Sequence, residues 1–190
     1  MAIILASGSP RRRELLEMLG ARDMLVIPAK GDEVPPRGAG PGDTVKALSR
    51  AKTLEVAEHR PAGDVIIGAD TIVWLDGRVL GKPHSEREAA EMLNALSGRA
   101  HEVWTGVCIA RGGEVLCEAE RTEVRFRELS GREIAAYIAT GEPMDKAGAY
   151  GAQGLGALFV ERIDGDFFNV MGLPLCRLGR MLKKLGVELL

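Results

Sequence analysis

One acidic side chain, Asp70, interrupts a long apolar stretch of the sequence. It follows Val65-Ile66-Ile67-Gly68-Ala69 and precedes Thr71-Ile72-Val73. A carboxylate buried in a strand is costly unless a cation or a metal ion lies beside it. Such carboxylates commonly act as general bases or metal ligands, so we expect Asp70 to serve one of these roles, with Thr71 on the rim of the same site. The alternatives are a strand end that reaches water and, for Thr71, an ordinary strand former.

Lys52 falls on the apolar face of a predicted helix. On a helical wheel it lies among Val45, Leu48 and Val56 rather than on the polar face. A lysine in such a place either extends its ammonium group to water or meets an anion. The sequence leaves both possibilities open.

Lys82 lies on the returning arm of a predicted hairpin. The Asp76-Gly77 pair is typical of a type I′ turn, and Leu80-Gly81-Lys82-Pro83 follows it. A two-residue turn would place Lys82 opposite Thr71, near Asp70 but on the other face of the strands. Because the glycine and the proline could break this register, the relation between Lys82 and Asp70 stays open.

The first strand-to-helix turn indicates an anion-binding site. The apolar residues 3–6 are followed by Ser7-Gly8-Ser9 and then by a helical pattern that begins at Pro10. Ser9 is a favourable N-cap, and proline suits the first helical position. Arg11, Arg12 and Arg13 occupy the first turn, where the helix dipole favours anions over cations. The turn therefore predicts phosphate binding, with a solvated basic turn as the alternative.

Two predicted loops carry residues that would matter if a nucleotide binds. Glu33 follows Asp32 in a loop rich in proline and glycine, and carboxylate oxygens can bind Mg²⁺ on a triphosphate. Without a metal ion, this acidic pair is an ordinary solvated loop. The glycine-rich residues 141–156 allow close approach to a ligand, and Gln153 offers both a donor and an acceptor to the edge of a base. Tyr150 could stack or simply pack, and a flexible loop is the alternative for this segment.

Alternating strand and helix patterns must position these side chains. Together with three hairpin signals, they predict an α/β fold with a mixed twisted sheet and flanking helices. No linker is evident, so we expect a single domain, residues 1–190, with two lobes that share the sheet. Asp43 and the capping boxes Ser85/Glu88 and Ser130/Glu133 mark three helix starts. The expected strands are 3–6, 25–27 and 64–75, the hairpins turn at Asp76-Gly77, Gly112-Gly113 and Asp164-Gly165, and the helices are 10–19, 44–58, 85–96, 130–139 and a last one after Pro174.

The composition disfavours several classes of protein. The chain has 190 residues, a formal net charge of −2 and 4% aromatic residues, which argues against a nucleic-acid-coating protein. No apolar stretch approaches the ~20 residues that cross a bilayer. The N-terminus is apolar before it is basic, which is the reverse of a secretory signal. We therefore expect a cytoplasmic protein without nucleic-acid or membrane partners.

The three cysteines show neither a CxxC pair nor metal-ligand spacing. A two-residue turn at Gly112-Gly113 would place Cys108 directly opposite Cys117 on one face of the hairpin. We expect these two residues to be small apolar packers in a reduced protein.

Taken together, these motifs resemble the Maf family, whose members were first named for septum-formation inhibition and act as nucleoside triphosphate pyrophosphatases. The resemblance runs from Ala2 to the last helix, in the order and spacing of the family. No single motif is decisive, but the set is specific. The segments that carry it are Ser7-Gly8-Ser9-Pro10-Arg11-Arg12, Asp32-Glu33, Arg50-Ala51-Lys52, Gly68-Ala69-Asp70-Thr71, Gly81-Lys82-Pro83 and Asp145-Lys146-Ala147-Gly148-Ala149-Tyr150-Gly151-Ala152-Gln153-Gly154.

The resemblance implies a fold similar to that of inosine triphosphate pyrophosphatases, with an active cleft between two lobes. It also implies hydrolysis of a nucleoside triphosphate to the monophosphate and pyrophosphate with Mg²⁺, or with Mn²⁺ or Co²⁺ in its place. A homodimer is suggested in the same way. Arg11, Thr71 and Gln153 resemble the branch that acts on dTTP and UTP, with modified pyrimidine triphosphates as further substrates. Ala152 stands where the family pattern has isoleucine, which could loosen the base pocket.

The resemblance also assigns roles to residues. Asp70 is the expected catalytic base, and Glu33 with Asp70 is expected to hold the metal ion. The expected substrate-binding residues are Ser7, Ser9, Arg11, Arg12, Lys52, Thr71, Lys82 and Gln153.

Two alternatives to this function remain. One is a pyrophosphatase for another nucleotide, such as methylated GTP. The other is a non-catalytic, nucleotide-binding regulator of cell division. Asp70 argues against the regulator, because binding an anion gains nothing from a neighbouring carboxylate unless a metal ion is present.

Overall fold

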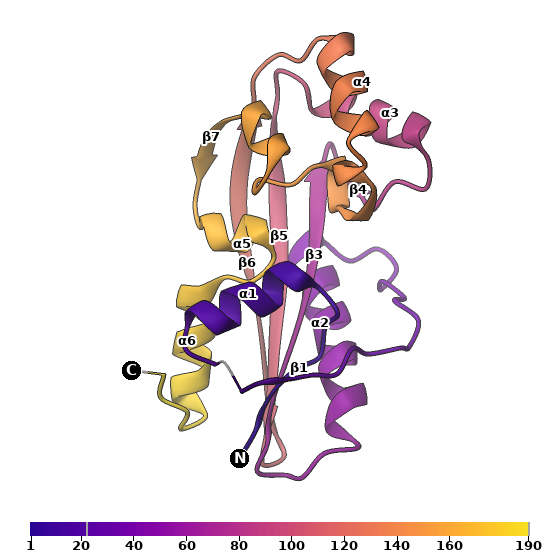
Figure 1. Ribbon diagram of the computed structural model, residues 1–190. Coiled ribbons are helices and arrows are strands. Elements are labelled where there is room, and N and C mark those ends of the chain that lie inside the picture. Colours follow the sequence, from indigo (N-terminus) through magenta and orange to yellow (C-terminus); the bar gives the residue numbers. More distant parts are fainter. Residues whose placement is uncertain (22, 190) are drawn as a thin grey trace. The chain divides into compact units, whose positions relative to one another are not determined.

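The computed structural model describes residues 1–21 and 23–189. Within these residues the backbone forms a seven-stranded sheet in the order β2-β1-β3-β5-β6-β7, and β4 pairs with β3 (Figure 1). The sheet is mixed, because β1 is parallel to β2 and β3 whereas β4 is antiparallel to β3 and β7 to β6. The expected α/β class is confirmed. The strands are β1 (Ile3–Leu5), β2 (Leu25–Val26), β3 (Val65–Leu75), β4 (Arg78–Leu80), β5 (Ala100–Arg111), β6 (Glu114–Phe126) and β7 (Val160–Asp164).

Helices flank the strands. The α-helices are α1 (Pro10–Met18), α2 (Pro41–Ala57), α3 (Glu86–Leu96), α4 (Gly131–Ala139), α5 (Phe167–Met171) and α6 (Leu175–Lys184), and three short 3₁₀ turns are η1 (Glu142–Asp145), η2 (Ala147–Ala149) and η3 (Leu155–Phe159). Among the described residues, none of these helices has the length and hydropathy of a membrane-spanning segment.

The chain divides into two compact units that exchange strands. Unit 1 comprises Met1–Asp70, Thr105–Glu120 and Gly172–Leu190, and unit 2 comprises Thr71–Trp104 and Arg121–Met171. The strands β3, β5 and β6 each begin in one unit and continue into the other. No segment of the sequence between the units is a linker, which is why composition marks no boundary.

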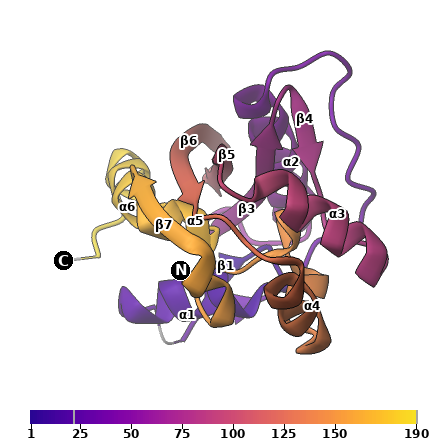
Figure 2. The ribbon, with the colours of Figure 1, turned by 90° about the horizontal axis from the view of Figure 1, so that it is seen from above.

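Unit 1 is built around the parallel strands β1 and β3. Figure 2 shows α1 and α2 on opposite sides of these strands. Two glycines let α2 lie close to the sheet, because a Cβ atom on Gly68 would meet Thr53 Oγ1 at 2.2 Å and one on Gly106 would meet the Val45 carbonyl oxygen at 2.1 Å. In α6, Leu178, Met181 and Leu182 recur at helical spacing and are fully buried. This packing fixes α2, which carries Lys52, against β3, which carries Asp70.

Unit 2 has its own core between the sheet and the pair α3 and α4, which lie side by side in Figures 1 and 2. Aromatic rings fill its centre: Phe126 makes edge-to-face contacts with Tyr150 at 4.6 Å and with Phe159 at 6.0 Å between ring centroids. Tyr137 contacts Phe159 in the same way at 4.9 Å. This core supports the glycine-rich residues that follow α4.

Two of the three predicted hairpins are confirmed and one is wrong. Asp76-Gly77 and Gly112-Gly113 form two-residue turns in which every residue has a positive φ, as type I′ turns require. Residues after Asp164-Gly165 do not return as a strand but form α5. The reason is Asp166, whose Oδ1 accepts the Phe168 N–H at 2.8 Å and so caps a helix instead.

Helix starts also differ from the prediction in two places. α2 begins at Pro41, three residues before Thr44, because proline fits the first helical position after Gly40 and Asp43 lies within the first turn. The capping box of α4 is complete, whereas that of α3 is not, since the Glu88 side chain accepts from the His84 N–H rather than from Ser85.

Cys108 and Cys117 face each other across the second hairpin, as the two-residue turn predicts. Their Cα atoms are 4.1 Å apart and the sulfur atoms form a disulfide, so the expectation of two unlinked packers is wrong. Cys176 is free and exposed.

Candidate functional site

The ammonium group of Lys52 lies between two carboxylates of unit 1. Lys52 Nζ is 2.5 Å from Asp70 Oδ1 and 2.8 Å from Glu33 Oε1. The Asp70 side chain is 8% exposed and that of Glu33 is 60% exposed, so one carboxylate is buried and the other faces solvent. Lys52 therefore meets anions rather than extending alone into water, and it offsets the cost of burying Asp70.

The packing of α2 on β3 sets the distance between Lys52 and Asp70. Next to Lys52, the Thr53 hydroxyl lies 2.8 Å from the Ser49 carbonyl oxygen and 3.2 Å from that of Cys108, within hydrogen-bond reach of both. Gly68, two residues before Asp70, leaves the space that Thr53 occupies. The apolar residues that share a helix face with Lys52 in the sequence thus correspond to the face of α2 that is turned toward the sheet.

Glu55 holds the loop that carries Glu33, a role that sequence reasoning missed. Its carboxylate accepts the N–H groups of Lys30 at 2.7 Å and of Gly31 at 3.0 Å. These two bonds stabilise the charged form and lower the pKa of Glu55. Glu55 lies one helical turn after Lys52, a spacing that places both side chains on one stretch of α2. In the sequence, this spacing was the one indication that Glu55 lies near the site.

Arg12 and Ser7 form a second group of contacts at the start of α1. Arg12 Nη1 donates to Ser7 Oγ at 3.0 Å and Nε donates to the Gly172 carbonyl at 2.8 Å. The Ser7 hydroxyl also accepts the Ser9 N–H at 3.3 Å. Ser9 occupies the N-cap position, but its side chain makes no capping bond, which corrects the expected cap.

Arg12 is electrically coupled to the acidic pair. Burial lowers the pKa of the Arg12 guanidinium, the Asp70 and Glu33 carboxylates oppose that shift, and the charge of Arg11 adds to it. Because arginine remains protonated in proteins, Arg12 keeps its positive charge. Arg13, by contrast, forms an exposed ion pair with Glu17 at 2.8 Å. The basic turn is therefore directed in part toward the carboxylates rather than wholly toward solvent.

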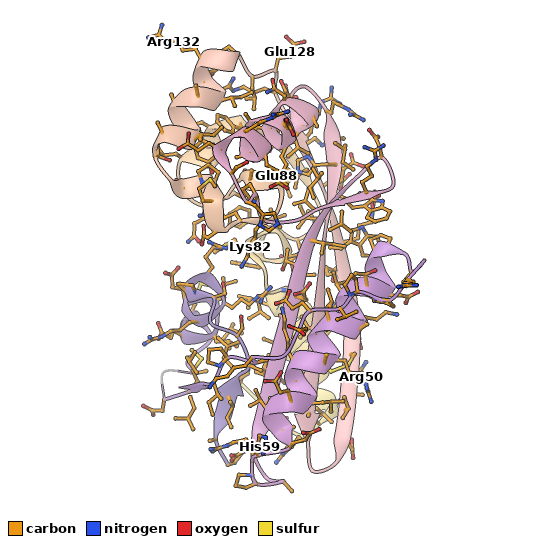
Figure 3. The ribbon with its side chains drawn as sticks, turned by 90° about the vertical axis from the view of Figure 1, so that its right-hand side faces the viewer. Arg50, His59, Lys82, Glu88, Glu128 and Arg132 are labelled. Carbon is orange, nitrogen blue, oxygen red and sulfur yellow. A yellow bond between two sulfur atoms is a disulfide. The ribbon has the colours of Figure 1, made fainter. Side chains whose placement is uncertain are left out.

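Lys82 lies just beyond the paired part of β4 in unit 2. The register ends at Val73 opposite Leu80, so the ideal pairing of Lys82 with Thr71 does not form. The neighbouring Gly81 carbonyl instead accepts the Gly148 N–H at 3.0 Å, which joins this segment to the glycine-rich loop. Lys82 itself is exposed and is labelled in Figure 3.

Gln153 is exposed in the same glycine-rich loop, between η2 and η3. Tyr150 is 5% exposed, and its hydroxyl lies 2.7 Å from His101 Nε2. Burial raises the pKa of Tyr150 and lowers that of His101 to about 4. Tyr150 therefore packs in the core of unit 2 instead of presenting its ring for stacking.

The structure distributes the predicted residues between the two units. Asp70, Lys52 and Glu33 are brought together by direct contact, and so are Ser7, Ser9 and Arg12. Thr71 follows Asp70 in β3 and is half-buried. Unit 1 contains Ser7, Ser9, Arg11, Arg12, Glu33, Lys52 and Asp70, and unit 2 contains Thr71, Lys82 and Gln153.

The carboxylate oxygens that meet in unit 1 are of the kind that bind a divalent cation. Asp70 and Glu33 supply hard carboxylate oxygens, and both contact the same ammonium group, so they converge on one positively charged point. In the part of the chain that the structure describes, no group of three or more His, Cys, Asp or Glu residues could hold a metal ion. Water and phosphate oxygens would have to complete the coordination shell.

The profile of the family described as Maf-like protein matches residues 2–185. The chain belongs to the Maf family. Two relatives from Bacillus cereus strains, both named dTTP/UTP pyrophosphatase, are 48% and 49% identical to it over 186 residues. The alignments cover 98% of this chain and 96% and 91% of the relatives. The resemblance noted from the motifs is confirmed.

A solved structure shares the fold of this Maf family member. The HAM1 protein from Coxiella burnetii aligns with a TM-score of 0.52 and 15% sequence identity, over 97% of this chain and 99% of that protein. A likeness at this identity concerns the fold alone. It agrees with the fold class expected from the sequence.

Proposed function

We propose that this member of the Maf family hydrolyses dTTP and UTP to the monophosphate and pyrophosphate. Its relatives with the name dTTP/UTP pyrophosphatase match 98% of the chain at 48–49% identity, which supports the substrate class. The observation that carries the chemistry is the buried Asp70 carboxylate, held against Lys52 with Glu33 alongside. A buried carboxylate paired with a specific cation is typical of functional sites, where such groups act as general bases or metal ligands.

Asp70 is the proposed base. Its carboxylate accepts a proton from a water molecule as the water oxygen bonds to the α-phosphorus. The bond from the α-phosphorus to the oxygen that bridges to the β-phosphate then breaks, and pyrophosphate leaves with that oxygen. Lys52 Nζ, 2.5 Å from Asp70 Oδ1, holds the carboxylate in one orientation. General-base catalysis of this kind contributes about 10²–10⁴-fold to the rate.

Glu33 and Asp70 are the residues proposed to hold a divalent cation, Mg²⁺ or else Mn²⁺ or Co²⁺. When bound, such an ion would neutralise charge on the phosphate oxygens. Glu33 is 60% exposed while it contacts Lys52, whereas Asp70 is buried against the same ammonium group. The two carboxylates thus differ in exposure, and the exposed Glu33 is the one that an ion arriving from solvent would reach first.

Positive and hydroxyl groups are proposed to bind the triphosphate. Arg11, Arg12, Lys52 and Lys82 supply charge, and Ser7 and Ser9 supply hydroxyl groups close to Arg12. Thr71 and Gln153, together with Arg11, are proposed to select the base, and the exposed amide of Gln153 can both donate and accept.

We further propose that residues 1–190 act as one domain, since the family profile spans segments of both units. A nucleoside triphosphate is the proposed partner. A homodimer and a cytoplasmic setting stay predictions.

Pyrophosphate release from dTTP, UTP, CTP, ATP, GTP and methylated GTP, with Mg²⁺ or Mn²⁺, tests the proposal. We expect selective release from dTTP and UTP, and a fall in kcat of about 10²–10⁴-fold in the Asp70→Asn variant. The matched control is Asp64→Asn, because Asp64 is equally buried and paired with Arg60 at 3.0 Å but is not assigned to the site. Asp64→Asn should lower stability and keep kcat.

The other outcomes separate the parts of the proposal. Near-normal turnover in Asp70→Asn would remove Asp70 from the role of base. Release from a different nucleotide would keep the chemistry and overturn the roles of Arg11, Thr71 and Gln153. Tight binding without release from any nucleotide would favour the regulator.

A further inference from the structure

Glu142, a half-buried carboxylate in η1, accepts three hydrogen bonds from other parts of unit 2. Its Oε1 accepts the Tyr137 hydroxyl at 2.9 Å and the Gly156 N–H at 3.2 Å, and its Oε2 accepts the Leu155 N–H at 3.0 Å. Burial alone would raise the pKa of Glu142, but these bonds outweigh it and the pKa is lowered. The side chain is therefore charged and joins η1, which follows α4, to residues 13 and 14 positions further along the chain.

Tyr137 extends this contact to a third point of the glycine-rich loop. Its hydroxyl donates to Glu142 and accepts the Gly151 N–H at 3.2 Å. Tyr137 is 4% exposed, and burial raises the pKa of its hydroxyl, so it stays protonated and able to donate. One carboxylate and one phenol thus bind three backbone N–H groups on both sides of Gln153.

The spacing of the glycines follows from these two side chains. A Cβ atom on Gly154 would lie 2.9 Å from Glu142 Oε2, and one on Gly156 would lie 2.5 Å from the Gly151 carbonyl oxygen and 2.8 Å from the Tyr137 hydroxyl. Gly154 also has a φ of 101°, which L side chains rarely adopt. The glycines at 154 and 156 therefore leave room for the carboxylate and the phenol. This explains them without invoking a flexible loop.

The start of the loop is fixed as well. Lys146 Nζ donates to the Glu142 carbonyl and to Asp145 Oδ1, both at 2.6 Å. Buried Tyr150 is held through His101 Nε2 at 2.7 Å. Between these fixed points Gln153 is exposed, and hydrogen bonds hold the backbone on either side of it.

We propose that Glu142 is a positioning residue that sets the choice of nucleotide base by holding the loop of Gln153. The proposal rests on the function proposed above, in which Gln153 reads the base. A side chain that reads a base edge must be held in place, because its hydrogen bonds discriminate only when their geometry is fixed. Glu142 does not touch the substrate in this account; it acts through the backbone of residues 151–156.

The Glu142→Gln variant tests the proposal. A glutamine side chain keeps the size of Glu142 but has one acceptor oxygen, so it cannot accept from both N–H groups and the phenol as the carboxylate does. We expect kcat/KM for dTTP and UTP to fall about tenfold relative to that for CTP. We also expect amide hydrogen exchange at Gly151, Leu155 and Gly156 to become faster. The Tyr137→Phe variant should act in the same direction, because it removes the hydroxyl that donates to Glu142 and accepts the Gly151 N–H.

The matched control is Glu133→Gln at the other end of α4. Glu133 accepts from Arg127 Nη2 at 2.7 Å and from the Ser130 N–H at 2.8 Å, and these partners lie outside residues 151–156. Its loss should lower the unfolding temperature of the protein and leave the preference among nucleotides as it was. A general weakening of unit 2 is thereby separated from a loss of loop position.

The Gln153→Ala variant distinguishes the failure of this inference from failure of the proposed function. Loss of discrimination in Gln153→Ala but not in Glu142→Gln overturns the inference alone. Unchanged discrimination in Gln153→Ala overturns the role of Gln153. If Glu142→Gln then still loses discrimination, Glu142 positions another group of the loop; if it does not, the proposed roles of Gln153 and Glu142 are both wrong, while the proposed hydrolysis stands. Slow amide exchange retained in Glu142→Gln would also overturn the inference.

Discussion

His101 is a single buried side chain that holds its neighbours without carrying a charge. Its Nε2 lies 2.7 Å from the Tyr150 hydroxyl, and its ring meets that of Phe126 at 90° with 5.0 Å between centroids. Its Nδ1 is buried and has no hydrogen-bond partner within residues 1–21 and 23–189. A protonated ring would place an unpaired charge in the aromatic core of unit 2, and burial accordingly lowers the pKa to about 4.

This shift predicts a pH dependence of stability. The unfolded chain binds a proton at His101 near pH 6.5, whereas the folded chain does so only near pH 4. Because the unfolded state binds more protons in this window, the free energy of unfolding should fall as the pH drops from 6.5 to 4, by roughly 3 kcal/mol at full extent. Urea unfolding at a series of pH values measures it.

Two histidine variants serve as the comparison. His101→Gln should flatten the dependence between pH 6.5 and 4. His59→Gln, at an exposed position, should leave it as in the parent protein. Equal slopes in all three proteins would show that His101 does not keep a lowered pKa in solution.

Among the elements, α2 has the largest influence on the candidate site. It carries Lys52 toward Asp70, and its Glu55 holds the loop of Glu33. It also lies close to the sheet, because Gly68 and Gly106 offer no side chain. Both the position of the ammonium group and the position of the acidic loop therefore depend on one helix.

A methyl group between α2 and β3 should be strongly destabilising. In Gly68→Ala the new Cβ would meet Thr53 Oγ1 at 2.2 Å and the Ser49 carbonyl at 2.9 Å, so the helix must shift. We expect a loss of about 1–3 kcal/mol in the free energy of unfolding. Gly179→Ala is the control, because that position in α6 has open space and alanine is favoured in helices by about 1 kcal/mol. Denaturant unfolding of both variants, with opposite signs, checks the prediction; equal losses would contradict it.

The bond between Glu55 and the loop should affect metal dependence. Glu55→Gln removes one acceptor for the Lys30 and Gly31 N–H groups, so Glu33 is less well held. We expect the Mg²⁺ concentration for half-maximal rate to rise by about 10-fold, as for other residues that orient metal ligands. Glu58→Gln, exposed just after the same helix, should not change it. A Glu55→Gln enzyme with the parent's Mg²⁺ dependence would show that the loop needs no such support.

In the molecule as a whole, neither compact unit is a continuous piece of chain. Unit 1 takes residues from three separate stretches and unit 2 from two, with β3, β5 and β6 shared. Residues predicted to act on the phosphates and residues predicted to act on the base are thereby encoded in alternating segments. A truncation that isolates one unit would cut strands of the other.

Local signals in the sequence predicted most of the elements. The hairpin turn at Asp76-Gly77 and the capping box of Ser130 and Glu133 each depend on residues within one short segment, and both are confirmed. The third hairpin was wrong because a single residue, Asp166, caps a helix where a turn was expected. The early start of α2 was missed because Pro41 was assigned to a loop.

The candidate site was harder to predict where contacts are distant in the chain. Lys52 and Asp70 could be recognised in the sequence, because a charged residue in an apolar pattern needs a partner of opposite charge. In the structure these two residues form an ion pair with each other. Glu55 and Glu142 were missed, since their partners lie 24 and 14 residues away and their neighbours in sequence are unremarkable. Gly154 and Gly156 were interpreted as allowing close approach of a ligand, with a flexible loop as the alternative, because the sequence does not show the side chains that fill their space.

The contact between Arg12 and the Gly172 carbonyl has a consequence for synthesis on the ribosome. The two partners are 160 residues apart, so Arg12 is synthesised early. The Gly172 carbonyl, which orients it, is added only near the end of translation. A nascent chain therefore carries its basic turn without its native geometry. We expect stalled chains that end before Gly172 to lack the native arrangement of the turn proposed to bind phosphate, whatever else they have already folded.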